Sequence, residues 1–153
     1  MKVAVRLGSV ADRAYVEDLG RRTVTSSVAA FRHAPDAVVL AALERLLEFT
    51  RERSHTTLIA ECDGERAGFV LVVDDLPDEV TLMPQGFIAY MAVEPSFRQR
   101  GAGSALLIAA EDEARRRGLP YMGLMVTEDN AAGRALYERA GYFTERRLLC
   151  KPL

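Results

Sequence analysis

A strand, a turn with two glycines and an amphipathic helix follow one another without interruption between Gly86 and Arg117. The turn reads Arg98-Gln-Arg-Gly101-Ala-Gly103. A helix that begins at such a turn directs several free backbone N–H groups to one place, and glycines without Cβ atoms let a bulky group approach the backbone. The helix dipole and the arginines favour negative charge there. This order of elements predicts an anion site at the start of the helix, best suited to a pyrophosphate.

Two better-known phosphate motifs do not match this turn. The dinucleotide fingerprint GxGxxG would need a third glycine where Leu106 stands, and no GxxxxGK run followed by Ser or Thr occurs in the chain. A plain alternative is a glycine-rich turn that leads into a surface helix whose arginines are only solvated. The turn on its own leaves both interpretations open.

The rest of the chain predicts an α/β sandwich with a mixed sheet. Two strand-like runs flank Asp63-Gly64, which is a strong hairpin signal, and strands alternate with helices after them. We expect strands over residues 3–7, 56–62, 65–73, 86–93, 121–126 and 147–150. We expect helices over about 10–23, 103–117 and 130–140, and one that begins at Pro35-Asp36. The length of 153 residues fits one domain over residues 1–153.

Composition and charge argue against several classes of protein. Lys plus Arg number 20 and Asp plus Glu number 22, so the formal charge of −2 offers no basic field for nucleic acid or an anionic membrane. No apolar run of about 18 residues and no leader-like segment occurs. Cys62 and Cys150 are too few for a disulfide scaffold. We expect a cytoplasmic protein with reduced thiols, in which His33 and His55 are surface or loop residues.

A second informative segment runs from Tyr121 to Tyr142 and joins a strand, a loop and a helix. Asn130 suits the N-cap of that helix. Tyr137 lies two turns further along the same face, and its phenol, with an unperturbed pKa of about 10, could donate a proton to a departing thiolate at neutral pH. Taken alone, a capping asparagine and a packing tyrosine would also explain these residues.

Together, the two segments resemble the GNAT superfamily of N-acetyltransferases, over most of the chain and most strongly from residue 87 to residue 142. The run from Arg98 to Gly103 matches the family's acyl-CoA signature, which is Gln or Arg, two residues, Gly, one residue, and Gly or Ala. A second family block is matched by Asn130, Leu136-Tyr137 and Gly141-Tyr142. The resemblance implies a splayed, mixed and mostly antiparallel sheet of about six or seven strands with about four helices. Acyl-CoA would lie in the gap after the fourth strand.

The resemblance also implies which residues contact acetyl-CoA as co-substrate. Backbone groups of Met91, Ala92 and Val93 would hold the pantetheine arm as an added strand would. The pyrophosphate would be bound by backbone amides of Arg98, Gln99, Arg100, Gly101, Ala102, Gly103 and Ser104. Asn130 would contact the pantetheine region, and Tyr137 would stabilise or protonate the CoA sulfur. The implied reaction needs no metal, because an amine attacks the thioester directly in a ternary complex.

The sequence leaves the general base open. The strands expected at 87–93 and 121–126 contain no acid, so the nearest candidates are Glu61, Glu79, Glu94 and Glu128, each of which could equally be a solvated carboxylate. Deprotonating a lysine-like amine of pKa about 10.4 at pH 7 costs roughly 4.6 kcal/mol, against roughly 1.4 kcal/mol for an α-amine of pKa about 8. An acceptor with a low pKa, such as a small amine or a peptide N-terminus, could therefore react through a water relay.

Two other functions stay open at this point. One is a non-catalytic acyl-CoA-binding sensor, which the missing strand carboxylate would suit, and the other is acetylation of protein lysines or N-termini. An acidic loop from Asp74 to Glu79 could attract a cationic amine or simply be solvated. Only residues 143–153 follow Tyr142, which is short for this family. We therefore hypothesise that a partner in a homodimer or the segment Thr23–Ala34 completes the acceptor wall.

Overall fold

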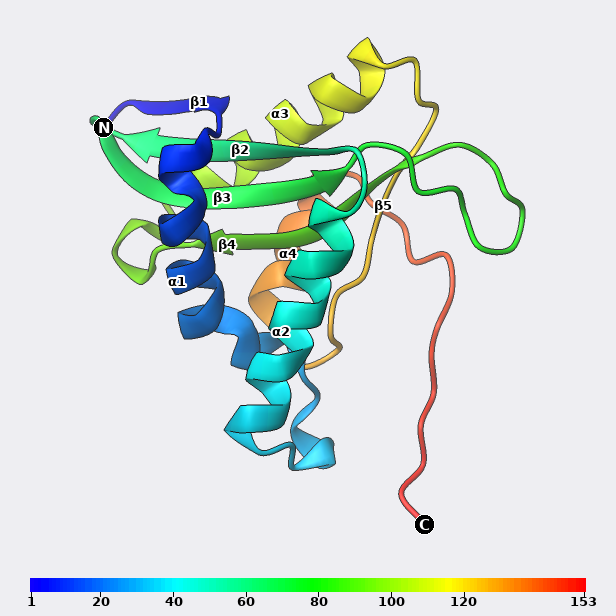
Figure 1. Cartoon of the computed structure of the whole chain (residues 1–153). Coiled ribbons are helices and arrows are strands. Elements are labelled where there is room, and N and C mark those ends of the chain that lie inside the picture. Colours follow the sequence, from blue (N-terminus) through cyan, green and yellow to red (C-terminus); the bar gives the residue numbers. More distant parts are fainter.

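A computed structural model describes all 153 residues, and five strands and four α-helices make up most of its regular structure (Figure 1). The strands are β1 (Val3–Leu7), β2 (His55–Cys62), β3 (Glu65–Val73), β4 (Gly86–Val93) and β5 (Met122–Leu124). The helices are α1 (Arg13–Thr23), α2 (Asp36–Arg51), α3 (Ala102–Arg116) and α4 (Ala131–Arg139). Short 3₁₀ turns are η1 (Val10–Asp12), η2 (Val24–Ser27), η3 (Ala30–Arg32) and η4 (Pro95–Phe97).

The five strands form one sheet in the order β1-β2-β3-β4-β5. The first four are antiparallel to their neighbours and β5 is parallel to β4, which confirms the predicted mixed sheet. The predicted count of six or seven strands is wrong, because no strand forms at Arg147–Cys150 or anywhere after α4. There the Arg146 guanidinium pairs with the buried carboxylate of Asp78 at 2.6 Å, beside the β3–β4 connection. The last residues follow this anchor and do not pair with β5.

Most predicted elements form within a residue or two of their expected bounds. Asp63 and Gly64 have φ of 51° and 87°, so the hairpin turns through two left-handed residues as an Asp-Gly pair favours. The helix predicted to start at Pro35-Asp36 does so, with Pro35 as its N-cap. The helix expected over residues 10–23 is divided, since η1 precedes α1.

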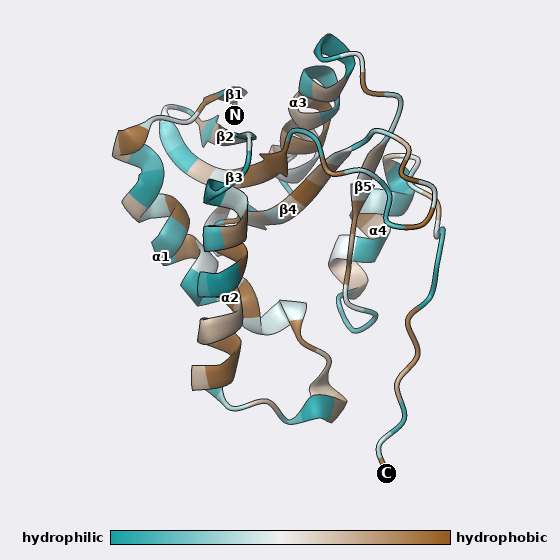
Figure 2. Ribbon diagram, turned by 45° about the vertical axis from the view of Figure 1, so that its right-hand side comes forward, coloured by the Kyte–Doolittle hydropathy of each residue, from teal (hydrophilic) through white to brown (hydrophobic).

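Two apolar cores lie on opposite faces of the sheet (Figures 1 and 2). One core lies under α1 and α2 and consists of Val16, Leu19, Val24, Val39, Leu43, Leu47, Ile59, Phe69, Leu71, Tyr90 and Ala92. The other lies under α3, with α4 packed against it, and consists of Leu58, Ala60, Cys62, Ala67, Val70, Val72, Ile88, Ala102, Leu106, Leu107 and Ala110. No helix combines the length and hydrophobicity that crossing a bilayer would require.

Strand β4 carries a bulge in its middle. Tyr90 and Ile88 pair with consecutive residues of β3, which leaves Ala89 without a residue opposite. As a result Ala89 and Tyr90 both face the core under α1 and α2, while Ile88 faces the other core. The ladder between β4 and β5 covers only Gly86 to Ile88, so the two strands part where the bulge begins.

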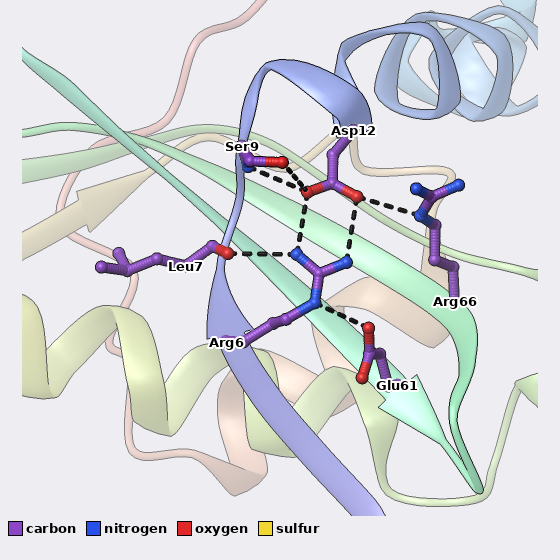
Figure 3. Close-up of polar contacts among 6 residues, drawn as sticks. All are labelled: Arg6, Leu7, Ser9, Asp12, Glu61 and Arg66. Atoms are coloured by element: carbon purple, nitrogen blue, oxygen red, sulfur yellow. Dashed lines mark hydrogen bonds and ion pairs between the residues drawn. The ribbon is translucent and has the colours of Figure 1, made fainter.

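A polar cluster at one end of the sheet ties β1, η1, β2 and β3 together (Figure 3). Its centre is Asp12, which is only 1% exposed. The Asp12 carboxylate accepts two hydrogen bonds from Arg6 at 2.8 and 3.0 Å, one from Arg66 at 2.9 Å and one from the Ser9 amide at 2.9 Å. Arg6 also donates to Glu61 at 2.6 Å. The bonds from Arg6 hold the pKa of Asp12 far below its usual range, although burial alone would raise it.

Replacing Asp12 by Asn keeps the shape of this side chain but removes its charge. We expect the free energy of unfolding at neutral pH to fall by about 2 kcal/mol, because hydrogen bonds to charged groups stabilise by roughly 1.5–3 kcal/mol. The pKa of Asp12 is lower in the folded than in the unfolded chain, so its stabilisation is present above the unfolded value and lost as pH falls through the folded one.

Urea unfolding of the wild type and of Asp12→Asn at several pH values should therefore show a gap that closes in acid. Asp18→Asn is the matched control, because Asp18 is an exposed partner of Arg22 and its loss should cost less than about 1 kcal/mol. A gap that stays the same from neutral pH into acid would contradict this account.

Candidate functional site

The parting of β4 and β5 leaves one edge of β4 unpaired. The ladder with β5 stops at Ile88, but β4 continues to Val93, so residues 89–93 have a strand neighbour on the β3 side only. The residues predicted to hold a ligand through their backbone, Met91, Ala92 and Val93, all lie on this open stretch. An extended ligand with amide groups can pair with such an edge as another strand would.

The turn that follows β4 presents free backbone donors. Gln99 and Gly101 have φ of 57° and 89°, and Gly101 is the N-cap of α3. After Arg98, the first amide that donates to a backbone carbonyl is that of Ala105, which bonds to Gly101 at 2.9 Å. The amides of residues 99–104 thus lie free at the positive end of a helix of 15 residues. These are residues for which the sequence predicts an anion site.

Two arginines in this turn carry uncompensated positive charge. Arg98 and Arg100 are exposed, and neither forms an ion pair. Arg98 reaches back to the carbonyl of Val93 at 3.4 Å. At the other end of α3, by contrast, Arg115 and Arg116 pair with carboxylates of their own helix. The field at the start of α3 is therefore positive from both the helix dipole and the side chains.

The two glycines of the turn have different tasks. Gly101 is needed for its positive φ, and a Cβ there would meet no other atom. A Cβ at Gly103 would lie 3.1 Å from a methyl group of Leu136, so Gly103 is small because α4 packs against it. The sequence predicts that both glycines admit an anion, and for Gly103 the structure adds this packing contact.

Asn130 and Tyr137, the two residues predicted from the second segment, belong to α4 and its N-cap. This helix lies on the same face of the sheet as α3. The Asn130 side chain accepts a hydrogen bond from the Gly133 amide at 3.0 Å, which confirms it as the N-cap. Tyr137 is half-buried, and its ring lies edge-on to that of Tyr142 with centroids 6.0 Å apart. Burial raises the pKa of Tyr137, and Tyr90 adds to the rise. The Tyr137 phenol therefore keeps its proton at neutral pH.

The four candidates for a general base lie on different elements, and each has an arginine as its neighbour. The pairs, with their N–O distances, are Glu61 and Arg6 at 2.6 Å, Glu94 and Arg22 at 2.8 Å, Glu79 and Arg146 at 3.8 Å, and Glu128 and Arg134 at 3.7 Å. The side chains of Glu79 and Glu128 are 74% and 88% exposed. No hydrogen bond or ion pair joins any of the four to Tyr137.

The acidic loop is not a free negative patch. Asp74 and Asp78 are 5% and 6% exposed. The Asp74 carboxylate accepts hydrogen bonds from two hydroxyl groups, both at 2.7 Å. Asp78 accepts from the amide and hydroxyl of Thr81 and pairs with Arg146. Because these two carboxylates hold the chain in shape, the loop attracts cations less than its composition indicates.

A hydroxyl pair that the sequence does not predict joins β4 to the end of α1. Tyr90 lies on the stretch of β4 that β5 leaves open, and its hydroxyl is 2.9 Å from Thr23 Oγ1 at the end of α1. Thr23 Oγ1 is itself held by the carbonyl of Leu19 at 2.8 Å. No motif marks either residue, and a tyrosine in an otherwise apolar buried strand was the one available signal.

The connection between α1 and α2 reaches across to the loop before α4. Thr127 Oγ1 donates to the carbonyl of Ser27 at 2.7 Å, and the Ala30 amide donates to Asp129 Oδ2 at 2.8 Å. The two bonds connect the segment that follows α1 to the segment that follows β5. The segment Thr23–Ala34 is thus tied to the loop before α4, and its part in an acceptor wall stays a prediction.

Residues 23–142 match the sequence model described as the Acetyltransferase (GNAT) family. The match includes the open strand, the glycine turn and α4. The chain belongs to the GNAT acetyltransferase family. No curated protein matches this GNAT chain.

Solved structures share the fold of this GNAT chain along its whole length. A protein from Pyrococcus furiosus described as an acetyl transferase is 26% identical, with a TM-score of 0.82 over 99% of this chain and 100% of that one. A ribosomal-protein-alanine N-acetyltransferase from Brucella melitensis biovar Abortus 2308 is 24% identical, with a TM-score of 0.71 and 100% of both chains covered. The structure of AAC(6')-Iy in complex with the bisubstrate analog CoA-S-monomethyl-acetylneamine is 21% identical, with a TM-score of 0.66 over 100% of this chain and 99% of that one.

Replacing Asp129 by Ala should free the segment that it holds. We expect hydrogen exchange at the Ala30 amide to become about fivefold faster, since an exposed bond of this kind contributes roughly 1 kcal/mol. Glu128→Ala is the control, because Glu128 is the residue before Asp129, its side chain is 88% exposed, and it has no bond to this segment. Equal exchange rates in the two variants would show that the bond does not hold the segment.

Proposed function

We propose that this GNAT chain is an acetyl-CoA-dependent N-acetyltransferase that moves an acetyl group from the thioester to a primary amine. Family membership supports acetyl transfer in general, and the solved AAC(6')-Iy complex holds a CoA-containing bisubstrate analog. The observation that carries the proposal is the row of free amides at the start of α3, next to the open edge of β4. Together they form a cradle for an anionic group joined to an extended arm.

The free amides at the start of α3 and the open edge of β4 both fit the chemistry of coenzyme A. The pyrophosphate would take the free amides of residues 99–104, with the dipole of α3 and the unpaired Arg98 and Arg100 supplying positive charge. The pantetheine arm contains amide groups, which can bond to the backbone of residues 91–93. Asn130 would contact the same arm through the side-chain atoms that its capping bond leaves free.

Tyr137 would supply the proton that the leaving group needs. In direct transfer the amine nitrogen bonds to the thioester carbonyl carbon, the C–S bond breaks and the sulfur leaves with the electron pair. The Tyr137 phenol would donate its proton to this thiolate, because burial raises its pKa and keeps it protonated. Its ring packs edge-on against that of Tyr142, which restricts the positions that the ring can take.

The surroundings of the opening favour an amine that loses its proton easily. Glu61, Glu79, Glu94 and Glu128 remain the candidates for a base, but all four have arginine neighbours. The Tyr90 hydroxyl, which lies 2.9 Å from Thr23 Oγ1, would instead position a water molecule that takes the amine proton and releases it to solvent. A small amine or a peptide amine of low pKa would suit such a relay better than a lysine.

The missing carboxylate also suits a second candidate, a non-catalytic sensor that binds acyl-CoA. The two functions differ in one measurement, which is thiol release from acetyl-CoA in the presence of a panel of small amines, peptides with free N-termini and lysine peptides. Release with any member supports the transferase and identifies its acceptor class. Binding of acetyl-CoA without release across the whole panel would favour the sensor.

Replacing Gly101 by Ala should weaken coenzyme binding. A Cβ at φ of 89° costs about 1–2 kcal/mol and would turn the free amides away from the pyrophosphate. We expect the affinity for CoA, measured by calorimetry, to fall about tenfold. Gly64→Ala is the matched control, since Gly64 has φ of 87°, equally open surroundings and a place in the β2–β3 hairpin.

The control should lose similar stability but keep its CoA affinity. Equal affinities in the Gly101 and Gly64 variants would remove the turn from the binding site. If the wild type itself takes up neither CoA nor acetyl-CoA, the proposed function fails.

Replacing Tyr137 by Phe tests the proton donor. If Tyr137 acts as general acid, kcat should fall by about 10²–10⁴ while the affinity for CoA stays the same. Because burial raises the pKa of Tyr137, the loss of wild-type activity through this group should need a more alkaline pH than an ordinary tyrosine needs to lose its proton. The control is Tyr121→Phe, whose side chain is 54% exposed. A kcat within a factor of about two of the wild type would exclude this role.

A further inference from the structure

Two consecutive residues at the end of α1 contact β4 on either side of its open stretch. The Thr23 hydroxyl lies 2.9 Å from the hydroxyl of Tyr90. The Arg22 guanidinium donates two hydrogen bonds to the carboxylate of Glu94, at 2.8 and 3.0 Å. Glu94 directly follows β4, and its amide extends the ladder with β3 by donating to the Ala67 carbonyl at 2.8 Å. At roughly 3.3 Å per residue, the two contacts lie about 13 Å apart along the strand.

The residues between these two contacts need support from α1. From Ala89 onward β4 has a strand neighbour on the β3 side only, so fewer hydrogen bonds hold its backbone than hold a central strand. Helix α1 crosses the face of the sheet near this end of β4 (Figure 1). It therefore holds the open stretch from one face, through a hydroxyl pair at one end and an ion pair at the other.

Glu94 also connects the open edge to the turn that follows it. Its carbonyl accepts a hydrogen bond from the Phe97 amide at 2.9 Å, which closes η4. The free amides of residues 99–104 come directly after this 3₁₀ turn. A displacement of Glu94 would therefore shift both the backbone of residues 91–93 and the amides at the start of α3.

The Arg22–Glu94 pair is partly shielded from water. The Glu94 side chain is only 18% exposed, and the Tyr15 hydroxyl nearby is buried without a hydrogen-bond partner. Burial raises the pKa of Tyr15 to about 12, and the charge of Glu94 adds to the rise. No other ion pair involves a residue from Gly86 to Gly101. A guanidinium that donates twice to one carboxylate fixes the direction of both groups as well as their distance.

We propose that Arg22 and Glu94 are positioning residues that hold the open edge of β4 and the turn after it in the arrangement that binds coenzyme A. This inference rests on the proposed function. Without the pair, the edge and the turn would take further conformations, and the apparent Kd for CoA would rise as the binding-competent fraction falls. Glu94 thereby has a task that involves no proton transfer, because both of its carboxylate oxygens accept from Arg22.

A double-mutant cycle tests whether the two residues act as one unit. Glu94→Gln and Arg22→Gln should each raise the Kd for CoA, measured by calorimetry, and the KM for acetyl-CoA about fivefold, while kcat stays within a factor of about two. The double variant should bind CoA no more weakly than either single variant. Asp18→Asn is the control, because it removes the other, 64% exposed partner of Arg22 and should leave the CoA affinity unchanged.

Two results of this cycle would overturn the proposal. One is a CoA affinity that is the same in Glu94→Gln as in the wild type, whether or not kcat falls. A large fall in kcat at unchanged affinity would assign Glu94 to proton transfer instead. The other is a double variant in which the two losses of affinity multiply, because independent effects exclude a shared task.

Hydrogen exchange of the free protein tests the same pair without any ligand. The amides of Glu94 and Phe97 should exchange about fivefold faster in Arg22→Gln than in Asp18→Asn, because the end of β4 and η4 open more often. Equal exchange rates in these two variants would show that the pair does not hold this segment. If the wild type binds no CoA, the proposed function fails, and the exchange rates still decide whether Arg22 and Glu94 hold the end of β4.

Discussion

One unpaired residue in β4 decides where this protein can bind anything extended. Ala89 has no residue opposite it in β3, and from this point β4 and β5 separate. Beyond this point β4 has a strand neighbour only on the β3 side, and its other edge is free for a ligand. Because the strand then leads into the turn with Gly101, the open edge and the free amides of α3 are neighbours by chain connectivity.

Much of the fold follows from local patterns that tertiary contacts do not override. The Asp63-Gly64 pair predicts its hairpin because few other residues accept two left-handed conformations in succession. The free amides at the start of α3 are predictable from a local pattern too, since the first amides of any helix lack partners within the helix. Asn130 caps α4 as its side-chain chemistry indicates.

The parts that escaped prediction depend on contacts between distant segments. The last strand was expected from the composition of residues 147–150, but Arg146 finds Asp78, which lies 68 positions earlier in the chain, and the strand does not form. The hydroxyl pair of Tyr90 and Thr23 joins positions 67 apart, and no local pattern announces it. The burial of Asp78 could not be predicted for a related reason. Its acidic neighbours indicate a solvated loop, but its ion-pair partner lies far along the chain and no local pattern identifies it.

The contact between Gly103 and Leu136 makes two tasks depend on one small residue. Leu136 and Tyr137 are consecutive residues of α4, so a displacement of Leu136 also displaces Tyr137. A methyl group added at Gly103 would press on α4 and shift the phenol, in addition to narrowing the turn. The packing of α4 on the first turn of α3 therefore sets the separation between the free amides and the phenol in the chain itself, before any ligand binds.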